Sequence, residues 1–310
     1  MEKGSRIQAI LRCAAGHYSA STHGTLKQRV LELSGQIDSQ VNSTRQSELS
    51  IFVYHTAVPE GQPIVPISDT QSLDQREFSY ALILEHFCNI ALSHHPLCQI
   101  FLVTDSDTPT ELNHPNVQVI RLALDTASPM FERVVAMNAF VQSEVFTGPV
   151  AFLDSDAFVN RKLARIFEKS FDVAVTYRAA PAAMPFNEGV LFAKVEDKRA
   201  VRGFFDAYLG TYASLCATTV LQDKFGEEFS NIKRWRGGQL SLNIVATKHG
   251  QEKTQRIKVL NCDPFNFWLS PGSTFTIAEL KEKYILHLKG PAKGSFDQIK
   301  VAQNRIFSSN

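Results

Sequence analysis

Gly148-Pro149-Val150-Ala151-Phe152-Leu153-Asp154-Ser155-Asp156-Ala157-Phe158-Val159 is the stretch that decides the fold class of this chain. Its apolar run from Val150 to Leu153 predicts a buried strand, and two carboxylates, Asp154 and Asp156, follow at its end. Ligands of open α/β sheets bind outside the carboxyl ends of such strands. Carboxylate oxygens are the ligands that Mg²⁺ and Mn²⁺ prefer, and these ions keep positions open for phosphate oxygens. The stretch therefore predicts a metal-bridged phosphate ester as the ligand.

The composition limits the classes of protein that fit. With 310 residues, 44% of them hydrophobic, the chain can bury a substantial core, and a formal net charge of +1 does not favour a nucleic-acid surface. No apolar run is long enough to span a bilayer, and the N-terminus lacks the apolar segment of a signal peptide. The five cysteines are scattered without a metal-binding spacing, which predicts reduced thiols and a cytoplasmic setting.

The first 48 residues differ from the rest and are rich in Ser, Gln, Thr and His. They hold two short amphipathic segments with helical spacing, around Ile7–Leu11 and Leu26–Ile37. We predict a helical or partly disordered N-terminal extension over residues 1–48, either a stem or a docked helix, and a single domain over residues 49–310.

The pattern of apolar runs within that domain alternates between strands and helices. Strands are predicted over 50–56, 99–103, 117–124, 150–153, 172–176, 189–193, 257–260 and 284–287, and helices over 75–92, 131–142, 199–208 and 238–247. This order predicts an α/β sandwich with a mostly parallel central sheet.

A pair of aspartates at a strand end is weak evidence alone, because Asp often caps a turn or a helix. Asp105-Ser106-Asp107 shows the same pattern at the end of another predicted strand. The second pair, Asp154 and Asp156, is flanked by apolar residues on both sides. Carboxylates beside low-dielectric walls need a charge partner, so we favour the second pair as the metal site.

A second motif lies near the C-terminus, at His287-Leu288-Lys289-Gly290-Pro291-Ala292-Lys293. Neutral imidazole can complete the coordination of a metal, glycine permits close backbone approach, and lysine matches the charge of a phosphate. Alone, the motif would be better explained by a surface turn after a strand, with a partly exposed His.

Together, Asp154-Ser155-Asp156 and His287-x-x-Gly290-x-x-Lys293 resemble the motifs of the GT-A nucleotide-sugar glycosyltransferases. Among these, the chain is most similar to the retaining family 8 type, which includes glycogenin and bacterial lipopolysaccharide galactosyltransferases; the likeness covers roughly residues 50–295. The resemblance implies a GT-A fold and a Mn²⁺ or Mg²⁺ ion held by Asp154, Asp156 and His287. It also implies transfer of a hexose from a UDP-sugar to an acceptor hydroxyl, with retention.

The resemblance assigns further site residues. Those expected to contact the nucleotide sugar are Thr56, Arg133, Ser155, Gly290 and Lys293. Asn187 is expected to face the sugar, and Gln239 to lie beside the anomeric carbon. Gly238 replaces the aspartate that the family has there, so either the donor sugar differs or Glu188 supplies the carboxylate. Arg133, Asn187 and Gln239 would otherwise be ordinary helix-surface or turn residues.

The acceptor is not indicated by any motif; a glycan, a lipid-linked sugar, a protein or a small molecule all fit, and a homo-oligomer is left open. Trp235, Phe267 and Trp268 could form a platform for a carbohydrate or could pack in the core.

Three alternatives stay open. A nucleotidyltransferase shares the architecture, but the chain lacks a Gly-rich loop after its first strand. A binding module for nucleotides or glycans could keep the fold without turnover, and the replacement at Gly238 favours this. A phosphatase or receiver domain would use Asp105 and Asp107, and would leave the C-terminal motif unexplained.

Overall fold

A computed structural model describes residues 20–41, 47–57, 80–179, 185–217, 237–252, 256–269, 275–288 and 296–308. The helices are α2 (Ala20–Gln40), α3 (Tyr80–His94), α4 (Pro129–Gln142), α5 (Ala164–Phe167), α6 (Lys198–Ala217), α8 (Gly237–Glu252), α9 (Cys262–Phe265), α10 (Ile277–Lys281) and α11 (Phe296–Ser308). The strands are β1 (Ser50–Tyr54), β2 (Gln99–Thr104), β3 (Val117–Arg121), β4 (Val150–Asp154), β5 (Ala157–Val159), β6 (Val173–Tyr177), β7 (Phe186–Ala193), β8 (Ile257–Asn261), β9 (Phe267–Leu269) and β10 (Ile285–Leu288).

Seven strands form the central sheet, in the order β3-β2-β1-β4-β7-β6-β8. All neighbouring strands are parallel except at β7, which runs antiparallel to both β4 and β6. The predicted fold class, an α/β sandwich with a mostly parallel central sheet, is confirmed. The chain passes from β1 to β2 and β3 on one side and then returns to β4 on the other. The switch point of the topology therefore lies between β1 and β4, where open α/β sheets bind their ligands.

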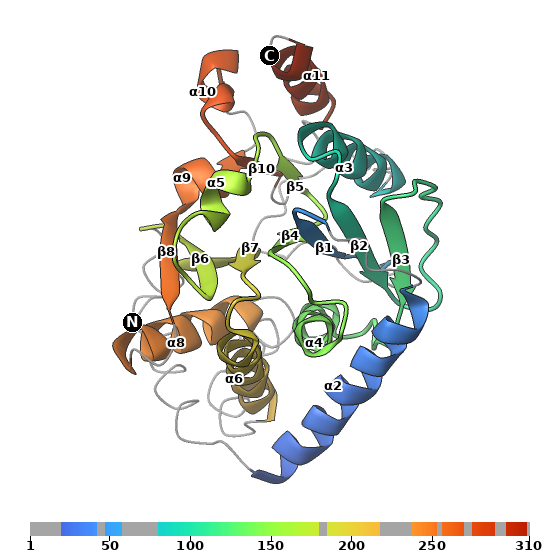
Figure 1. Ribbon diagram of the computed structural model, residues 1–310, viewed down its shortest axis with the longest axis vertical. Helices are drawn as coiled ribbons and strands as arrows, with labels where there is room; N and C mark the ends of the chain where they lie inside the picture. Colours follow the sequence, from blue (N-terminus) through green and yellow to red (C-terminus); the bar gives the residue numbers. More distant parts are fainter. Residues whose placement is uncertain are drawn as a thin grey trace, which may run out of the picture.

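Helices cover both faces of this sheet (Figure 1). Along β1, alternate residues point to opposite faces: Ile51 and Val53 pack on the side of α3, whereas Phe52 packs on the side of α4, α6 and α8. On that second side the Phe52 ring lies 5.3 Å from Phe140 of α4 and 5.2 Å from Phe152 of β4, between ring centroids. Burial on both faces explains why the central strands are continuous apolar runs in the sequence.

A second, three-stranded sheet has the order β5-β10-β9. β5 is antiparallel to β10, and β9 is parallel to it. The chain leaves the large sheet at Asp154, turns through Ser155 and Asp156, and enters the small sheet at Ala157. The two aspartates therefore stand at the junction of the two sheets.

Helix α2 of the N-terminal segment docks on the domain. Val30, Leu33 and Ile37 are buried against the α4 side of the core, and Arg29 forms an ion pair of 2.6 Å with Glu132 of α4. The Gln40 side chain accepts the backbone N–H of Arg121 at 2.9 Å and donates to its carbonyl at 2.8 Å, on the edge strand β3. Of the two hypotheses for this segment, the docked helix is the one observed for α2; the segment around Ile7–Leu11 lies outside the described residues. The division of the chain at residue 48 stays a prediction.

Several predicted boundaries differ from those of the structure. The helix predicted over 199–208 continues to Ala217, because aromatic and leucine side chains keep its buried face apolar beyond Tyr208. The strand predicted over 117–124 ends at Arg121, where pairing with β2 ends. The short elements α5, α9, β9 and α10 were not predicted, because elements of three to five residues give no clear periodicity. The C-terminal helix α11, of 13 residues, was missed as well.

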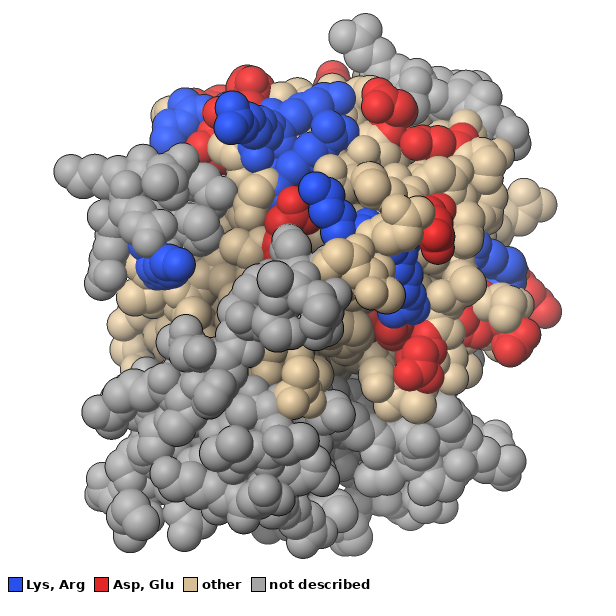
Figure 2. All heavy atoms as spheres, turned by 90° about the horizontal axis from the view of Figure 1, so that it is seen from below, with Lys and Arg blue, Asp and Glu red and all other residues tan. Residues whose placement is uncertain are grey.

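The surface carries charges of both signs. Figure 2 shows the molecule from below the view of Figure 1. On this face, basic side chains (blue) and acidic side chains (red) lie side by side. Among the described helices, none combines the length and the apolar character required for a membrane span.

His95 gives a pH-dependent test of the packing next to β5. It is buried, its Nε2 accepts the backbone N–H of Leu163 at 2.9 Å, and burial lowers its pKa to about 4. The ring must stay neutral to accept this bond. Because the folded pKa lies below the unfolded value of about 6.5, the stabilisation is complete above that value and is lost as the pH falls towards 4.

We therefore expect the unfolding free energy to fall by about 1–2 kcal/mol between about pH 7 and pH 5 through His95 alone. Urea unfolding of the wild type and of His95→Gln across this range isolates the effect, since other histidines titrate in both proteins. Equal pH dependence in the two would contradict it.

Candidate functional site

The register of the strands brings distant residues to the switch point. Tyr54 at the end of β1 is the neighbour of Asp154 at the end of β4, and Leu153 is paired with Val190 of β7. Because β7 is antiparallel, its first residues meet the carboxyl ends of β4 and β6. In the small sheet, His287 of β10 is paired with Ala157 of β5, directly after Asp156.

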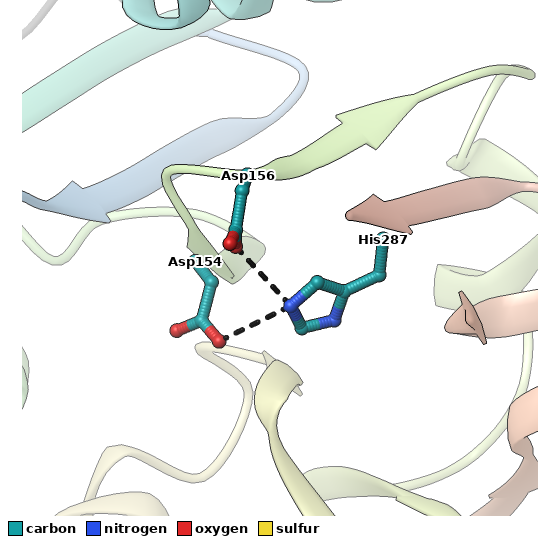
Figure 3. Close-up of side chains that lie close together, drawn as sticks. All are labelled: Asp154, Asp156 and His287. Atoms are coloured by element: carbon teal, nitrogen blue, oxygen red, sulfur yellow. Dashed lines mark ion pairs between the residues drawn. The ribbon is translucent and has the colours of Figure 1, made fainter. Parts of the chain in front are cut away.

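Asp154, Asp156 and His287 form a compact cluster, in which the possible ligand atoms all lie within 4.8 Å of one another. The Nε2 atom of His287 lies 3.2 Å from Oδ1 of Asp156 and 3.5 Å from Oδ2 of Asp154. Figure 3 shows both carboxylates directed at this nitrogen. His287 is 1% exposed, whereas the Asp154 side chain is 24% exposed, so the cluster can be reached from the side of Asp154. The sequence prediction named these three residues as metal ligands, and the fold brings them together.

This approach depends on Gly189 of β7. A Cβ atom there would collide with Cε1 of His287, Oδ2 of Asp154 and the side chain of Asn187. A side chain at position 189 would occupy the space in which the carboxylate and the imidazole meet.

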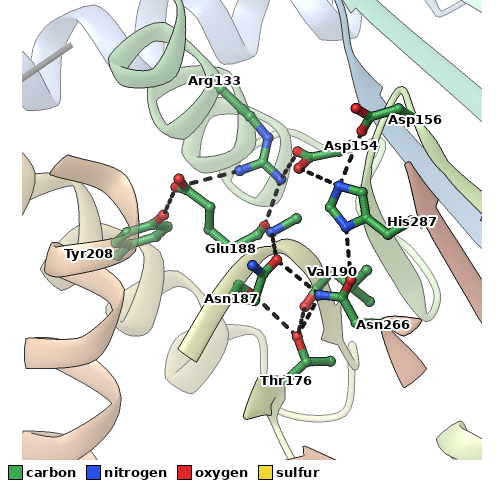
Figure 4. Close-up of polar contacts among 11 residues, drawn as sticks. Arg133, Asp154, Asp156, Thr176, Asn187, Glu188, Val190, Tyr208, Asn266 and His287 are labelled. Carbon is green, nitrogen blue, oxygen red and sulfur yellow. Dashed lines mark hydrogen bonds and ion pairs between the residues drawn. The ribbon is translucent and has the colours of Figure 1, made fainter. Parts of the chain in front are cut away.

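Arg133 of α4 is buried behind the cluster. Its Nη2 lies 3.0 Å from Oδ1 of Asp154 and donates to the carbonyl of Glu188 at 2.8 Å, and its Nη1 lies 3.7 Å from Oε2 of Glu188 (Figure 4). Burial lowers the pKa of Arg133, but the carboxylates of Asp154 and Glu188 outweigh it and raise the pKa. The guanidinium therefore stays charged and holds Oδ1 of Asp154, while Oδ2 faces His287.

Glu188 is held by two further residues. The hydroxyl of Tyr208 on α6 donates to Oε2 of Glu188 at 2.9 Å, and burial, together with that carboxylate, raises the pKa of Tyr208 well above its usual value. The carboxylate lies against Gly238 at the start of α8, where a Cβ atom would fall far inside van der Waals contact with Oε2. The Glu188 carboxylate thus occupies the place that a side chain at position 238 would take.

The other ring nitrogen of His287 contacts a group that the sequence prediction missed. Nδ1 lies 2.8 Å from Oδ1 of Asn266, and Nδ2 of Asn266 donates to Oδ1 of Asn187 at 2.9 Å and to Oγ1 of Thr176 at 3.0 Å (Figure 4). Asn187 also accepts the backbone N–H of Gly189 at 3.0 Å. All of these side chains are buried.

A cavity of about 600 Å³ opens at the carboxyl ends of β1 and β2. Its walls include Thr56 and the rings of His55 and Tyr80, whose centroids lie 5.4 Å apart. Thr56 lies two residues beyond Tyr54, which is paired with Asp154, so the cavity opens at the same edge of the sheet as the cluster.

The opposite wall of the cavity is formed by the loop after β2, which contains the first aspartate pair. Asp105 accepts the backbone N–H groups of Asp107 and Thr108 and the Thr108 hydroxyl. Burial would raise the pKa of Asp105, but these hydrogen bonds lower it. The guanidinium of Arg121 donates to the carbonyls of Asp105 and Thr108, both at 3.0 Å. The first pair therefore shapes a turn, as the alternative explanation held.

The remaining predicted residues lie around the cluster or outside the described chain. Ser155 is half-buried in the turn between the two aspartates, and Gln239 is half-buried in the first turn of α8. Gly290 and Lys293 lie outside the described residues, as does Trp235. Asn266, Thr176 and Tyr208 were missed, because a single Asn, Thr or Tyr in a strand, helix or turn carries no sequence pattern.

No protein-family model and no curated protein matches this chain. Among solved structures it is similar to WbbM, a bifunctional glycosyltransferase in its apo form, with 14% identity over 82% of this chain and 48% of that one and a TM-score of 0.48. It is also similar to the apo form of the glycosyltransferase GlyE of Streptococcus pneumoniae TIGR4, with 16% identity over 85% of this chain and 64% of that one and a TM-score of 0.47.

A third similar structure is a glycosyltransferase involved in glycosylation of the major capsid of PBCV-1, with 12% identity over 82% of this chain and 98% of that one and a TM-score of 0.39. The chain thus spans about half the length of the WbbM protein and about two thirds of GlyE. All three likenesses are remote.

The contact between Glu188 and Gly238 can be tested by a double-mutant cycle. We expect Gly238→Ala to displace the carboxylate from Tyr208 and Arg133 and to lower the unfolding free energy by about 1–3 kcal/mol. In a Glu188→Ala background the same change should be neutral or stabilising, because the obstructing carboxylate is gone.

Gly35→Ala in α2 is the matched control, since nothing lies within 4 Å of a Cβ atom there. It should stabilise the helix by about 0.5–1 kcal/mol. Denaturant unfolding measures the four proteins of the cycle and the control, and an identical cost of Gly238→Ala in both backgrounds would contradict the contact.

Proposed function

We propose that this chain is a metal-dependent glycosyltransferase of the GT-A kind, which moves a hexose from a UDP-sugar to an acceptor hydroxyl with retention. The observation that carries the proposal is the convergence of Asp154, Asp156 and His287 at the switch point of the sheet, next to a cavity large enough for a nucleoside. The resemblance to family 8 enzymes, given by the two sequence motifs, supports the retaining assignment.

The cluster fits a divalent cation of the Mn²⁺ or Mg²⁺ type. Two carboxylates and an imidazole suit Mn²⁺, and the half-open side at Asp154 leaves positions for other oxygen ligands. The described residues around the cluster carry three carboxylates, counting Glu188, and one guanidinium, Arg133. The carboxylates therefore give the cluster an excess of negative charge, which a divalent cation would balance.

The cavity beside the cluster fits the nucleoside of the donor. Thr56 and the rings of His55 and Tyr80 offer a surface for a base, and the base would then lie within a diphosphate's reach of Asp154. Asp154, Asp156 and His287 would hold the cation, which would supply positive charge against the charge that develops on the leaving group. Lys293 and Gly290, which lie outside the described residues, are proposed to add to this stabilisation.

The residues behind the cluster are proposed to orient the sugar. The amide oxygen of Asn187 accepts hydrogen bonds from Gly189 and Asn266. Its amide nitrogen donates to none of the described residues, so it can donate to a sugar hydroxyl. Glu188 would supply the carboxylate that the family takes from position 238, since it lies directly over Gly238. Gln239 would lie beside the anomeric carbon. With the donor so held, the leaving phosphate itself can accept the proton of the acceptor hydroxyl.

Trp268 offers a contact for the acceptor. It is paired with His287 in the parallel register of β9 and β10, so both side chains lie on the same face of the small sheet, and it is 50% exposed. The guanidinium of Arg178 lies 5.7 Å from its ring centroid. An exposed indole beside the cluster supports a carbohydrate acceptor, which would stack on it. Phe267, on the opposite face, packs under the ammonium of Lys283 instead.

A binding module without turnover is the second candidate, which the glycine at position 238 favoured. The position of Glu188 weakens this argument, because a carboxylate is present at the same place. The cytoplasmic setting and the oligomeric state stay predictions.

Asp156→Ala tests the proposal. We expect the release of nucleoside diphosphate from a panel of nucleotide sugars with Mn²⁺ to fall more than about 100-fold, because the cation loses a direct ligand. Asp107→Asn is the matched control, an exposed aspartate of the turn-forming pair, and should keep full activity.

Thermal unfolding with and without Mn²⁺ shows whether both variants fold. Full Mn²⁺-dependent turnover in Asp156→Ala would overturn the assignment. A wild type that is stabilised by a nucleotide sugar with Mn²⁺ but releases no diphosphate would be a binding module.

A further inference from the structure

His287 can act as a ligand through Nε2 only if that nitrogen carries a lone pair rather than a proton. The structure shows which tautomer the protein enforces, through the buried chain of hydrogen bonds that ends at Nδ1. The donor and the acceptor of each hydrogen bond in this chain can be assigned from one fixed point, because a backbone N–H is always a donor.

The fixed point is the backbone N–H of Gly189, which lies 3.0 Å from the amide oxygen of Asn187. Rotating the Asn187 amide would place its NH₂ group against this N–H, donor against donor, so the oxygen must stay where it is. The same oxygen lies 2.9 Å from Asn266, which must therefore present its amide nitrogen.

Thr176 fixes Asn266 a second time. Its hydroxyl proton is directed to the carbonyls of Asn187 and Val190, at 3.2 and 3.4 Å, so its oxygen is left to accept from Nδ2 of Asn266 at 3.0 Å. With both amide hydrogens engaged, Asn266 has only its oxygen to offer to His287. That oxygen lies 2.8 Å from Nδ1, and it can only accept.

We propose that Asn266 is a positioning residue that holds His287 as the Nδ1–H tautomer, so that the lone pair of Nε2 faces the oxygens of Asp154 and Asp156. The inference deepens the proposed function, because it explains how the third ligand is prepared before a cation arrives. An Nε2 lone pair at 3.2 and 3.5 Å from two carboxylates is an arrangement that a cation stabilises.

The proposal adds a role for Asn187 that the resemblance did not imply. By holding Asn266, Asn187 transmits the polarity of the Gly189 backbone N–H to the imidazole through three successive hydrogen bonds. The start of β7 therefore contributes to the cluster twice: Gly189 gives space for His287, and its N–H sets the tautomer.

The test observes the tautomer directly in the metal-free protein. Histidine is labelled with ¹⁵N, and the ring-nitrogen resonances report which nitrogen carries the proton. Of the nine histidines, His287 is assigned by the resonances that vanish in His287→Gln. We expect Nδ1 of His287 to be protonated in the wild type, and Asn266→Ala to shift the ring wholly or partly to the Nε2–H form, which donates to Asp156.

Asn160→Ala is the matched control. Asn160 is also a buried asparagine beside the small sheet, and it donates to the carbonyls of Leu280 and Lys283, away from His287. It should lose stability as Asn266→Ala does and yet keep the wild-type tautomer. Titration with Mn²⁺, followed by electron paramagnetic resonance, should show an affinity about 10–100-fold lower in Asn266→Ala and unchanged in Asn160→Ala.

A proton on Nε2 in the wild type, or an unchanged tautomer in Asn266→Ala, would overturn the proposal. Its failure is distinct from that of the proposed function. A wild type that carries the proton on Nδ1 but binds no Mn²⁺ would refute the metal site while supporting the role of Asn266.

Discussion

The close approach of Asp154 and His287 over Gly189 is the contact on which the candidate site depends. The carboxylate ends the large sheet and the imidazole belongs to the small one, so their meeting fixes how the two sheets join. It is possible only because β7, which runs antiparallel to its neighbours in the large sheet, places Gly189, a residue without a Cβ atom, at this point. A parallel strand between β4 and β6 would have placed its carboxyl end, rather than its first residues, next to Asp154.

Buried charge is the second constraint. A carboxylate at the end of a buried strand is costly unless it is paired, and Arg133 provides the pair from the helix below. The same guanidinium contacts Glu188, and Glu188 accepts from Tyr208, so that these buried side chains are linked in series. The rigidity of such a chain favours a site whose geometry is complete before a ligand binds.

The fold and the three residues of the cluster could be predicted because they depend on local patterns. Apolar runs ending in Asp or Thr mark the strands and their carboxyl ends, and the flanking residues separate Asp154 from Asp105. The supporting residues depend instead on register. Asn266 follows a four-residue helix, and Tyr208 lies in the middle of α6, and neither position is distinguished until β7 is inserted between β4 and β6. The ends of α6 and β3 were missed for a similar reason, since tertiary packing and strand pairing set them.

Arg121 gives the N-terminal helix an unexpected connection. Its peptide group is bound by Gln40 of α2, which takes the place of a further strand at the sheet edge, while its guanidinium holds the loop that walls the cavity. One residue thus joins a segment that seemed peripheral in the sequence to the place where a base would bind. Shortening the chain to its α/β domain would leave the peptide group of Arg121 without the Gln40 side chain that binds it. Exchanging α2 between related chains would for the same reason also change the cavity.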